Sequence, residues 1–382
     1  MNFLKIIIVV TLLCALVLSL VSCRNNLVNK WENYTGDTDY YQSFDNNNEE
    51  MTFETFFSEL VEDPVLVSAY GLPEYWNNEL LQVVYDTDKV LTAAGSNRTA
   101  FLWYNDSHLS YSARSSSAIL KFLQENTNIS YVNFGGDIVS DYDEVEHSEI
   151  IAQLYDWRKQ TLSLSNHHSV VGNHDDDIGE FLDRNDLYAF LLEDEVGKTE
   201  APTNKFCYYV DNASEKTRYI YLSTGFDETT CNDIRFLADT LMNTEADWHI
   251  VVVSHIWFVY NSTLTPTEGE VPEFAQTILN VLDDYNSRTM GCELDVEYDF
   301  AFAKAKVEFC IGGHTHVDFN FYTDGGIPVV LTETDSYHLR GEGKNAENEN
   351  EAAISVIVAD YNTNLIHIIR AGRGDDRTVP LS

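Results

Sequence analysis

From Ala100 onward, short apolar runs alternate with helix-like stretches, and this alternation most limits the folds open to the chain. The apolar runs cover 101–104 (FLWY), 131–134 (YVNF), 169–171 (SVV), 219–222 (YIYL), 250–253 (IVVV), 307–311 (VEFCI) and 329–331 (VVL). The helix candidates between them cover 115–124, 148–160, 180–192, 232–243 and 272–285. Strands that alternate with helices predict an α/β domain whose sheet is covered on both faces.

This domain is expected to span residues 100–382 and to close with a β-hairpin around Asn362-Thr363-Asn364. A helical extension, residues 52–99, precedes it. Its first helix, 52–62, ends before Asp63-Pro64, and its second begins at Pro73 and ends at Gly95. The second helix places apolar side chains on one face, which should pack on the outside of the main domain. These side chains are Trp76, Leu80, Val84 and Leu91.

The chain is strongly acidic, with 23 Lys and Arg against 62 Asp and Glu, a formal charge of −39. A nucleic-acid-binding module is not expected, because a polyanion is repelled and no run of Lys or Arg forms a basic patch. Adsorption on anionic lipid headgroups is disfavoured for the same reason. The acid excess is typical of a soluble, solvated surface.

The first residues have the pattern of a targeting segment. Lys5 precedes an apolar run, 6–22, that ends in Leu20-Val21-Ser22-Cys23. This ending resembles the lipobox of bacterial lipoproteins, so residues 1–23 are interpreted as a lipoprotein signal. A cleaved signal peptide and an uncleaved membrane segment are the alternatives, and all three place the chain outside the cytoplasm. Residues 24–51 are interpreted as a flexible acidic tether, and membrane contact is expected only through the N-terminal segment.

Four cysteines remain beyond the targeting segment: Cys207, Cys231, Cys292 and Cys310. In an exported chain an even number favours disulfides, and pairing of sequence neighbours (Cys207–Cys231 and Cys292–Cys310) is one of the pairings open to them. Cys310 lies in an apolar run, so a free buried thiol is an equally good interpretation of it.

Residue types that bind metals follow five of the apolar runs. The clusters are Asp106-Ser107-His108, Gly135-Gly136-Asp137, Gly172-Asn173-His174-Asp175, Ser254-His255 and Gly312-Gly313-His314-Thr315-His316. Ligands of α/β sheets gather at the carboxyl ends of strands, so the five clusters should meet in one crevice. Glycines beside three of them let the backbone turn tightly near a bound ion.

The ordered series D-x-H, GD, GNHD, H and G-H-x-H resembles the calcineurin-like metallophosphoesterase superfamily over about residues 100–336. The resemblance implies a four-layer α/β/β/α sandwich with two central mixed sheets. It also implies a dinuclear metal site and an enzyme that hydrolyses phosphate esters.

Carried onto these positions, the resemblance gives each motif residue a role. One metal is held by Asp106, His108 and His316, and the other by Asn173, His255 and His314, while Asp137 bridges both. A nitrogen and oxygen donor set without sulfur suits two divalent ions of Mn, Fe, Zn, Co or Ni. A bridging hydroxide attacks phosphorus in line and His174 protonates the leaving group, so His174, Asp137 and Asn173 are the expected catalytic residues.

Some positions depart from particular branches of the superfamily. The second motif, 136–141, lacks the arginine of the Ser/Thr protein phosphatases, and Ser140 stands where purple acid phosphatases carry a tyrosine ligand. Monoester or diester preference and oligomeric state stay open. The alternative functions are a non-catalytic, metal-containing binding or adhesion lipoprotein and a receptor for phosphate ligands.

Other polar and aromatic residues near the motifs are expected to have structural roles. His167 and His168 are interpreted as hydrogen-bonded residues at a strand edge, with support of a ligand as the alternative. Aromatic residues at strand ends are expected in the core, with the mouth of the cleft as the alternative: Tyr104, Tyr142 and Trp257. The acidic residues near the site are expected in solvated loops, with orientation of His174 or of a ligand histidine as the alternative: Asp141, Asp143, Asp175, Asp176 and Asp177. The tail arginines are expected to pair with carboxylates, with an anionic substrate as the alternative: Arg370, Arg373 and Arg377.

Overall fold

The computed structural model describes residues 67–108, 112–138, 154, 157–176, 184–223, 229–260, 269–336 and 348–382. The signal segment 1–23, the tether 24–51, the first expected helix 52–62 and part of the second motif, 139–141, lie outside the described residues. Among the described helices, none combines the length and the apolar character needed to cross a membrane.

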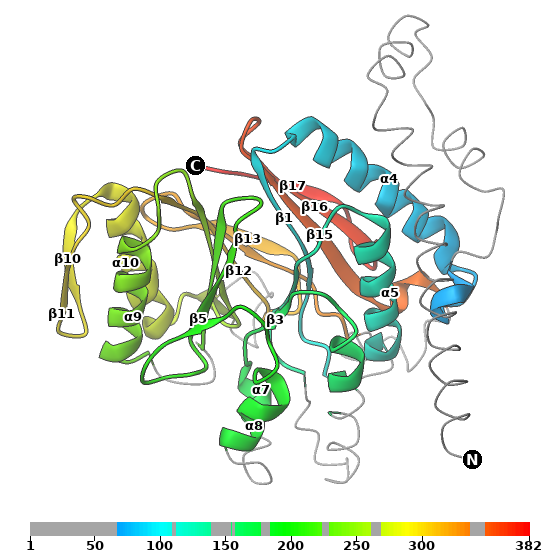
Figure 1. Cartoon of the computed structure of the whole chain (residues 1–382), viewed down its shortest axis with the longest axis horizontal. Coiled ribbons are helices and arrows are strands. Elements are labelled where there is room, and N and C mark those ends of the chain that lie inside the picture. Colours follow the sequence, from blue (N-terminus) through cyan, green and yellow to red (C-terminus); the bar gives the residue numbers. More distant parts are fainter. Residues whose placement is uncertain are drawn as a thin grey trace, which may run out of the picture. The chain divides into compact units, whose positions relative to one another are not determined.

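A six-stranded sheet forms one central layer (Figure 1). Its strands, in spatial order, are β17 (Arg377–Pro380), β16 (Leu365–Gly372), β15 (Ala353–Asp360), β1 (Arg98–Tyr104), β2 (Val132–Phe134) and β3 (His167–Ser169). The neighbours β1, β2 and β3 run parallel, whereas β15, β16 and β17 are antiparallel. The expected C-terminal hairpin is therefore confirmed as β15–β16.

A seven-stranded mixed sheet forms the second central layer. In spatial order it contains β13 (Phe319–Tyr322), β14 (Pro328–Leu331), β12 (Lys306–Gly312), β7 (His249–Ser254), β6 (Thr217–Leu222), β5 (Tyr208–Asn212) and β4 (Thr199–Glu200). The strands β6, β7, β12 and β14 are parallel. Two short antiparallel pairs stand apart from it: β8 (Val259–Tyr260) with β9 (Gly269–Glu270), and β10 (Met290–Glu293) with β11 (Val296–Asp299).

The two sheets pack face to face through fully buried side chains. The Phe101 ring of β1 stacks on Phe309 of β12 at 6.3 Å between centroids and meets the edge of Tyr219 of β6 at 5.5 Å. Nearby, the Trp103 indole donates a hydrogen bond of 2.7 Å to Thr332, which follows β14. Through these contacts, side chains of β1 in the six-stranded sheet form part of the core that the two sheets share.

Helices cover the outer face of each sheet. Helix α4 (Trp76–Ala94) and α5 (Ser112–Asn126) lie on the six-stranded sheet, and α9 (Cys231–Met242) and α10 (Glu273–Ser287) lie on the seven-stranded sheet (Figure 1). The four layers confirm the predicted α/β/β/α sandwich. The short helices are η1 (Ser68–Tyr70), α7 (Asn173–Asp176), α8 (Arg184–Leu191) and η4 (Glu349–Glu351).

Local sequence signals explain several element boundaries. Helix α9 begins at a capping box in which Thr230 and Asp233 bond each other's backbone N–H groups. Helix α4 begins three residues after Pro73 and ends at Gly95, whose φ is 59°. The apolar residues that the pattern predicted for one face of α4 are all buried: Trp76, Leu80, Val84 and Leu91. Strand β3 begins and ends two residues before the apolar run 169–171 that predicted it.

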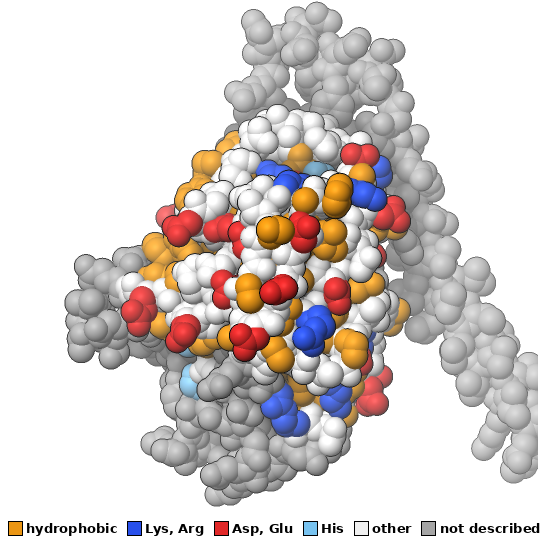
Figure 2. All heavy atoms as spheres, turned by 90° about the vertical axis from the view of Figure 1, so that its left-hand side faces the viewer, with side chains coloured by type: hydrophobic (Ala, Val, Ile, Leu, Met, Phe, Trp, Pro, Cys, Tyr) orange, Lys and Arg blue, Asp and Glu red, His pale blue; other side chains and the backbone are white. Residues whose placement is uncertain are grey.

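The described surface carries no continuous basic patch on the face of α9, α10 and the β10–β11 pair (Figure 2). Acidic side chains are scattered over it among fewer Lys and Arg residues. This agrees with the acidic composition of the whole chain.

Candidate metal centre

Five parallel strands deliver the expected ligands to one place. Asp106 and His108 follow β1, Asp137 follows β2, and Asn173 lies beyond β3 at the start of α7. From the second sheet, His255 follows β7, and the loop after β12 carries His314 and His316. Carboxyl ends of parallel strands meet at one edge, and here the edges of the two sheets coincide.

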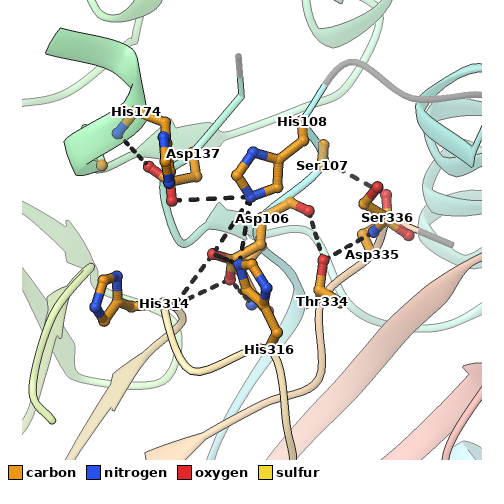
Figure 3. A network of polar contacts seen from close by, with 12 residues as sticks. Asp106, Ser107, His108, Asp137, His174, His314, His316, Thr334, Asp335 and Ser336 are labelled. Carbon is orange, nitrogen blue, oxygen red and sulfur yellow. Dashed lines mark hydrogen bonds and ion pairs between the residues drawn. The ribbon is translucent and has the colours of Figure 1, made fainter. Parts of the chain in front are cut away.

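The first group of potential ligands contains Asp106, His108, Asp137 and His316 (Figure 3). One donor atom from each lies within 4.8 Å of the others. His316 Nε2 is 3.2 Å from Asp106 Oδ1 and 3.4 Å from His108 Nε2. His108 Nε2 in turn lies 3.9 Å from Asp137 Oδ2. Such a spacing of carboxylate oxygens and imidazole nitrogens fits a metal ion.

The second group contains Asp137, His255 and His314. His255 Nε2 lies 3.0 Å from Asp137 Oδ2, and His314 Nδ1 lies 3.0 Å from Asn173 Oδ1. The amide of Asn173 therefore joins the group at the place that the motif order predicted. Asp137 belongs to both groups, so the two candidate positions share one carboxylate.

Two buried atoms test whether this arrangement fits metal ions. Asp137 Oδ2 and His255 Nε2 are buried and face each other, yet neither makes a hydrogen bond within the described part of the chain. The other ring nitrogen, His255 Nδ1, donates to the Gly135 carbonyl at 2.7 Å, which fixes the tautomer and leaves Nε2 as a lone-pair donor. Apart from this contact with each other, neither atom has a hydrogen-bond partner among the described residues, and a cation bound here would be coordinated by both, so the residues present fit it.

The electrostatics of the groups agree with cation binding. Burial lowers the pKa of both His108 and His314 to about 4, so both are neutral ligands at pH 7. Burial opposes ionisation of Asp106, but the neighbouring His316 outweighs it and holds the pKa of that carboxyl well below its usual range. Burial alone would lower the pKa of His255, whereas the facing Asp137 carboxylate raises it to about 9. A metal ion held by His255 and Asp137 would take the place of the His255 proton.

The ligand loops adopt an uncommon backbone conformation. Positive φ angles occur at Asp106 (51°), His108 (45°), Asp137 (57°), His314 (70°) and His316 (57°). Non-glycine residues with positive φ are rare and cost energy, and they cluster at functional sites. The strain turns each strand end sharply toward the common centre.

Asp175 supports the metal centre through hydrogen bonds to the backbone of the loops that carry the ligands. Its carboxylate is fully buried and accepts hydrogen bonds from the backbone N–H groups of Asp137 (3.1 Å), Ile138 (2.8 Å) and Gly172 (2.9 Å). The expectation of a solvated loop is therefore wrong for Asp175, because these N–H donors surround the carboxylate in the interior.

The loop after β14 was missed as part of the site. Thr334 Oγ1 donates to the Asp106 carbonyl at 2.8 Å, and the Asp335 N–H donates to the Asn105 carbonyl at 2.9 Å (Figure 3). Asp335 is fully buried and accepts from Ser116 Oγ at 2.6 Å. The signal was present, because Thr332–Ser336 follow the apolar run 329–331 as the other clusters follow theirs.

His174 lies beside the first group. Its backbone N–H donates to Asp137 Oδ1 at 2.9 Å, and its ring lies 5.2 Å from the His108 ring between centroids. The side chain is partly exposed at the edge of the centre.

The remaining aromatic and histidine candidates lie in the core. The Tyr104 hydroxyl lies 2.8 Å from His167 Nε2, and the Trp257 indole donates to the Ile311 carbonyl at 2.9 Å. His168 is fully buried, but neither of its ring nitrogens makes a hydrogen bond to a described residue. The expectation of a hydrogen-bonded strand-edge histidine holds for His167 and is wrong for His168. Tyr142 lies outside the described residues.

The arginine and cysteine expectations have clear outcomes. Arg370, Arg373 and Arg377 pair with carboxylates, as expected. The neighbour pairing of cysteines is wrong: all four described cysteines are free thiols, of which Cys207 and Cys310 are buried and Cys231 and Cys292 are exposed. The interpretation of Cys310 as a free buried thiol is confirmed.

Comparisons with known proteins concern the family of the chain and its fold. The sequence model of the calcineurin-like phosphoesterase family matches residues 99–318. Among solved structures, a dimetal phosphatase from Danio rerio is similar, with a TM-score of 0.50 and 13% identity over 74% of this chain and 99% of that chain. The E. coli phosphoesterase Yfce has a TM-score of 0.32 and 11% identity over 74% of this chain and 100% of that chain. No curated protein matches the chain.

Proposed function

Because the chain belongs to the calcineurin-like phosphoesterase family, we propose that it hydrolyses a phosphate ester at a site for two divalent metal ions. The observation that carries the proposal is the position of Asp137. Its Oδ2 lies 3.0 Å from His255 Nε2 and 3.9 Å from His108 Nε2, between the histidines of the two ligand groups. A carboxylate in this position suits a bridge between neighbouring ions.

The proposed first position uses Asp106, His108 and His316, and the proposed second uses Asn173, His255 and His314. Two bound divalent ions supply a hydroxide nucleophile near neutral pH and neutralise the charge of the phosphoryl oxygens. Mn, Fe, Zn, Co and Ni are the ions that this nitrogen and oxygen donor set suits.

The protein's own part in the reaction is to orient and to transfer a proton. The backbone N–H of His174 is bonded to Asp137 Oδ1, which holds the start of α7 against the bridging carboxylate. The His174 ring lies 5.2 Å from the His108 ring between centroids, and we assign it the role of general acid that protonates the departing alkoxide. Asn173 is oriented by His314, whose Nδ1 lies 3.0 Å from the Asn173 oxygen.

The location of the protein is part of the proposal. The lipobox-like sequence at Cys23 supports export and attachment to a membrane through the N-terminal segment, and secretion is the alternative. The substrate is a phosphate ester available outside the cytoplasm, either a monoester or a diester.

The test combines metal analysis with hydrolysis. Purified full-length protein supplied with Mn²⁺ or Zn²⁺ should retain about two ions per chain and hydrolyse p-nitrophenyl phosphate or bis-p-nitrophenyl phosphate. The His174→Ala variant should keep its ions and lose about 10²–10⁴-fold in kcat, the usual contribution of a general acid.

The outcomes separate the alternatives. Folded protein that binds neither ion nor substrate refutes the proposal. Retained ions without turnover indicate a metal-containing binding protein, and tight phosphate-ligand binding without product indicates a receptor. The ratio of the two hydrolysis rates distinguishes a monoesterase from a diesterase.

A further inference from the structure

Three arginines near the C-terminus contact loops that carry metal-centre residues. Arg370 and Arg377 bind Asp318, two residues after His316, and Arg373 binds Glu333, beside Thr334. We call Arg370, Arg373 and Arg377 the arginine clamp. They lie beyond residue 318, where the match to the family ends, and the proposed hydrolysis assigns them no role.

The contact with Asp318 is partly buried. The Arg370 side chain is 1% exposed, and its Nη2 donates to Asp318 Oδ1 at 2.6 Å. The same oxygen accepts from Arg377 Nη2 at 3.2 Å and from the Glu333 backbone N–H at 3.2 Å. One carboxylate oxygen thus joins the loop after His316 to the loop that follows β14.

The second contact extends to Asp106. Arg373 Nε donates to Glu333 Oε1 at 2.8 Å, and its Nη2 donates to the Thr334 carbonyl. Thr334 in turn donates its hydroxyl to the Asp106 carbonyl at 2.8 Å. The clamp therefore reaches both ends of the Asp106–His316 pair, whose side chains are 3.2 Å apart.

Gly374 packs the backbone directly onto the clamp. Its φ is +99°, and a Cβ there would lie 3.1 Å from Arg370 Nε, 3.1 Å from Glu333 Oε2 and 3.2 Å from Asp318 Oδ2. A side chain at this position would crowd all three charged groups, so the close approach requires glycine.

We propose that the arginine clamp is a positioning element for the metal position formed by Asp106, His108 and His316. This rests on the proposed two-metal function. In the described part of the chain the clamp makes no contact with His255 or Asn173, so its effect should fall on one of the two positions.

The experiment measures ion binding in the absence of substrate. Chelator-treated full-length protein is titrated with Mn²⁺ alone by calorimetry, and the two binding events are assigned with His316→Ala and His255→Ala. Asp318→Asn should weaken the event that His316→Ala removes by about 10–100-fold, as outer-shell changes do, and leave the other unchanged.

A matched control separates positioning from a general loss of stability. Asp211 receives a two-pronged bond from Arg218 at 2.7 and 2.8 Å on β5 and β6, away from the ligand loops. Asp211→Asn should reduce stability without changing either ion-binding event. Arg377→Gln provides a milder change in the clamp if Asp318→Asn does not fold.

Unchanged Mn²⁺ binding in folded clamp variants overturns the proposal, as does equal weakening of both events. Hydrolysis by the parent chain is scored separately. A failed clamp therefore leaves the proposed function standing, whereas a parent chain that binds Mn²⁺ without turnover refutes hydrolysis and leaves the clamp testable.

Discussion

Replacement of Asp175 by asparagine removes the charge that holds three backbone N–H groups beneath the metal centre. One carboxylate oxygen accepts from Asp137 and Gly172, and the other accepts from Ile138. Asparagine has one acceptor oxygen, so it retains the first two bonds in neutral form. Its NH₂ group then faces the Ile138 N–H, and a buried donor loses its acceptor.

The magnitude follows from the bonds changed. Hydrogen bonds to a charged group contribute about 1.5–3 kcal/mol each, neutral bonds contribute about 0.5–1.5 kcal/mol, and a buried unsatisfied donor costs about 1–3 kcal/mol. Two weakened bonds and one lost bond predict that Asp175→Asn lowers the free energy of unfolding by about 3–5 kcal/mol.

Urea unfolding in EDTA measures this loss without any contribution from bound metal. Asp233→Asn is the control, because Asp233 also accepts a backbone N–H, at the start of α9 away from the centre. A capping change typically costs about 0.5–2 kcal/mol. Repeating the measurement with Mn²⁺ should stabilise Asp175→Asn less than the parent, because the Asp137 loop is displaced. A loss for Asp175→Asn no larger than for Asp233→Asn would refute the reasoning.

Four further predictions concern other parts of the molecule. Burial lowers the pKa of His167 to about 3, so the native state binds its proton less readily than the unfolded chain, and stability falls as pH drops below about 6.5. His167→Gln should remove about 2 kcal/mol of the loss between pH 6.5 and 4.5, measured by urea unfolding at several pH values. Gly136→Ala should reduce Mn²⁺ affinity in calorimetry, because φ is +93° and the new Cβ would lie 2.8 Å from His255 Nδ1. Leu80→Ala should lower the free energy of unfolding by about 2–5 kcal/mol without changing Mn²⁺ affinity, since the Leu80 side chain on α4 is fully buried. Because the charge is −39, kcat/KM for an anionic ester should stay constant or rise as salt is added, and a steep fall would contradict this.

The sequence predicted the alternation of strands and helices and the convergence of the ligand clusters because their signals are local, whereas the four layers and the grouping of the ligands followed from the resemblance to the family. Each ligand cluster follows its own apolar run, and strand ends of an α/β sheet converge whatever the loops between them contain. The start of helix α9 could likewise be predicted from nearby residues, because Thr230 and Asp233 form its cap within four residues. Such features depend on residues that are close together in the chain.

Contacts between segments that are distant in the sequence could not be predicted in the same way. Only one of the donors to Asp175, the Gly172 N–H, is local, and the other two, at Asp137 and Ile138, lie 38 and 37 positions away in the sequence. Arg370 and Asp318 are separated by 52 positions. The cysteine pairing failed for a related reason: Cys207 is buried beside Ser223, and Cys310 lies inside β12, so their neighbours in space are not their neighbours in sequence.

The metal ligands and the residues that contact their loops together stabilise the conformation that binds metal. Five ligand positions have positive φ, each at a cost of order 1–3 kcal/mol for a non-glycine residue, so the motifs alone do not favour the conformation that binds metal. The strain persists only where surrounding contacts offset it, and the buried bonds of Asp175 and Thr334 act on the strained Asp137 and Asp106 themselves. The motif residues supply the donor atoms, and residues that no motif marks hold those atoms in place. Loss of such a supporting contact should therefore appear first as weaker metal binding, before any change at a ligand.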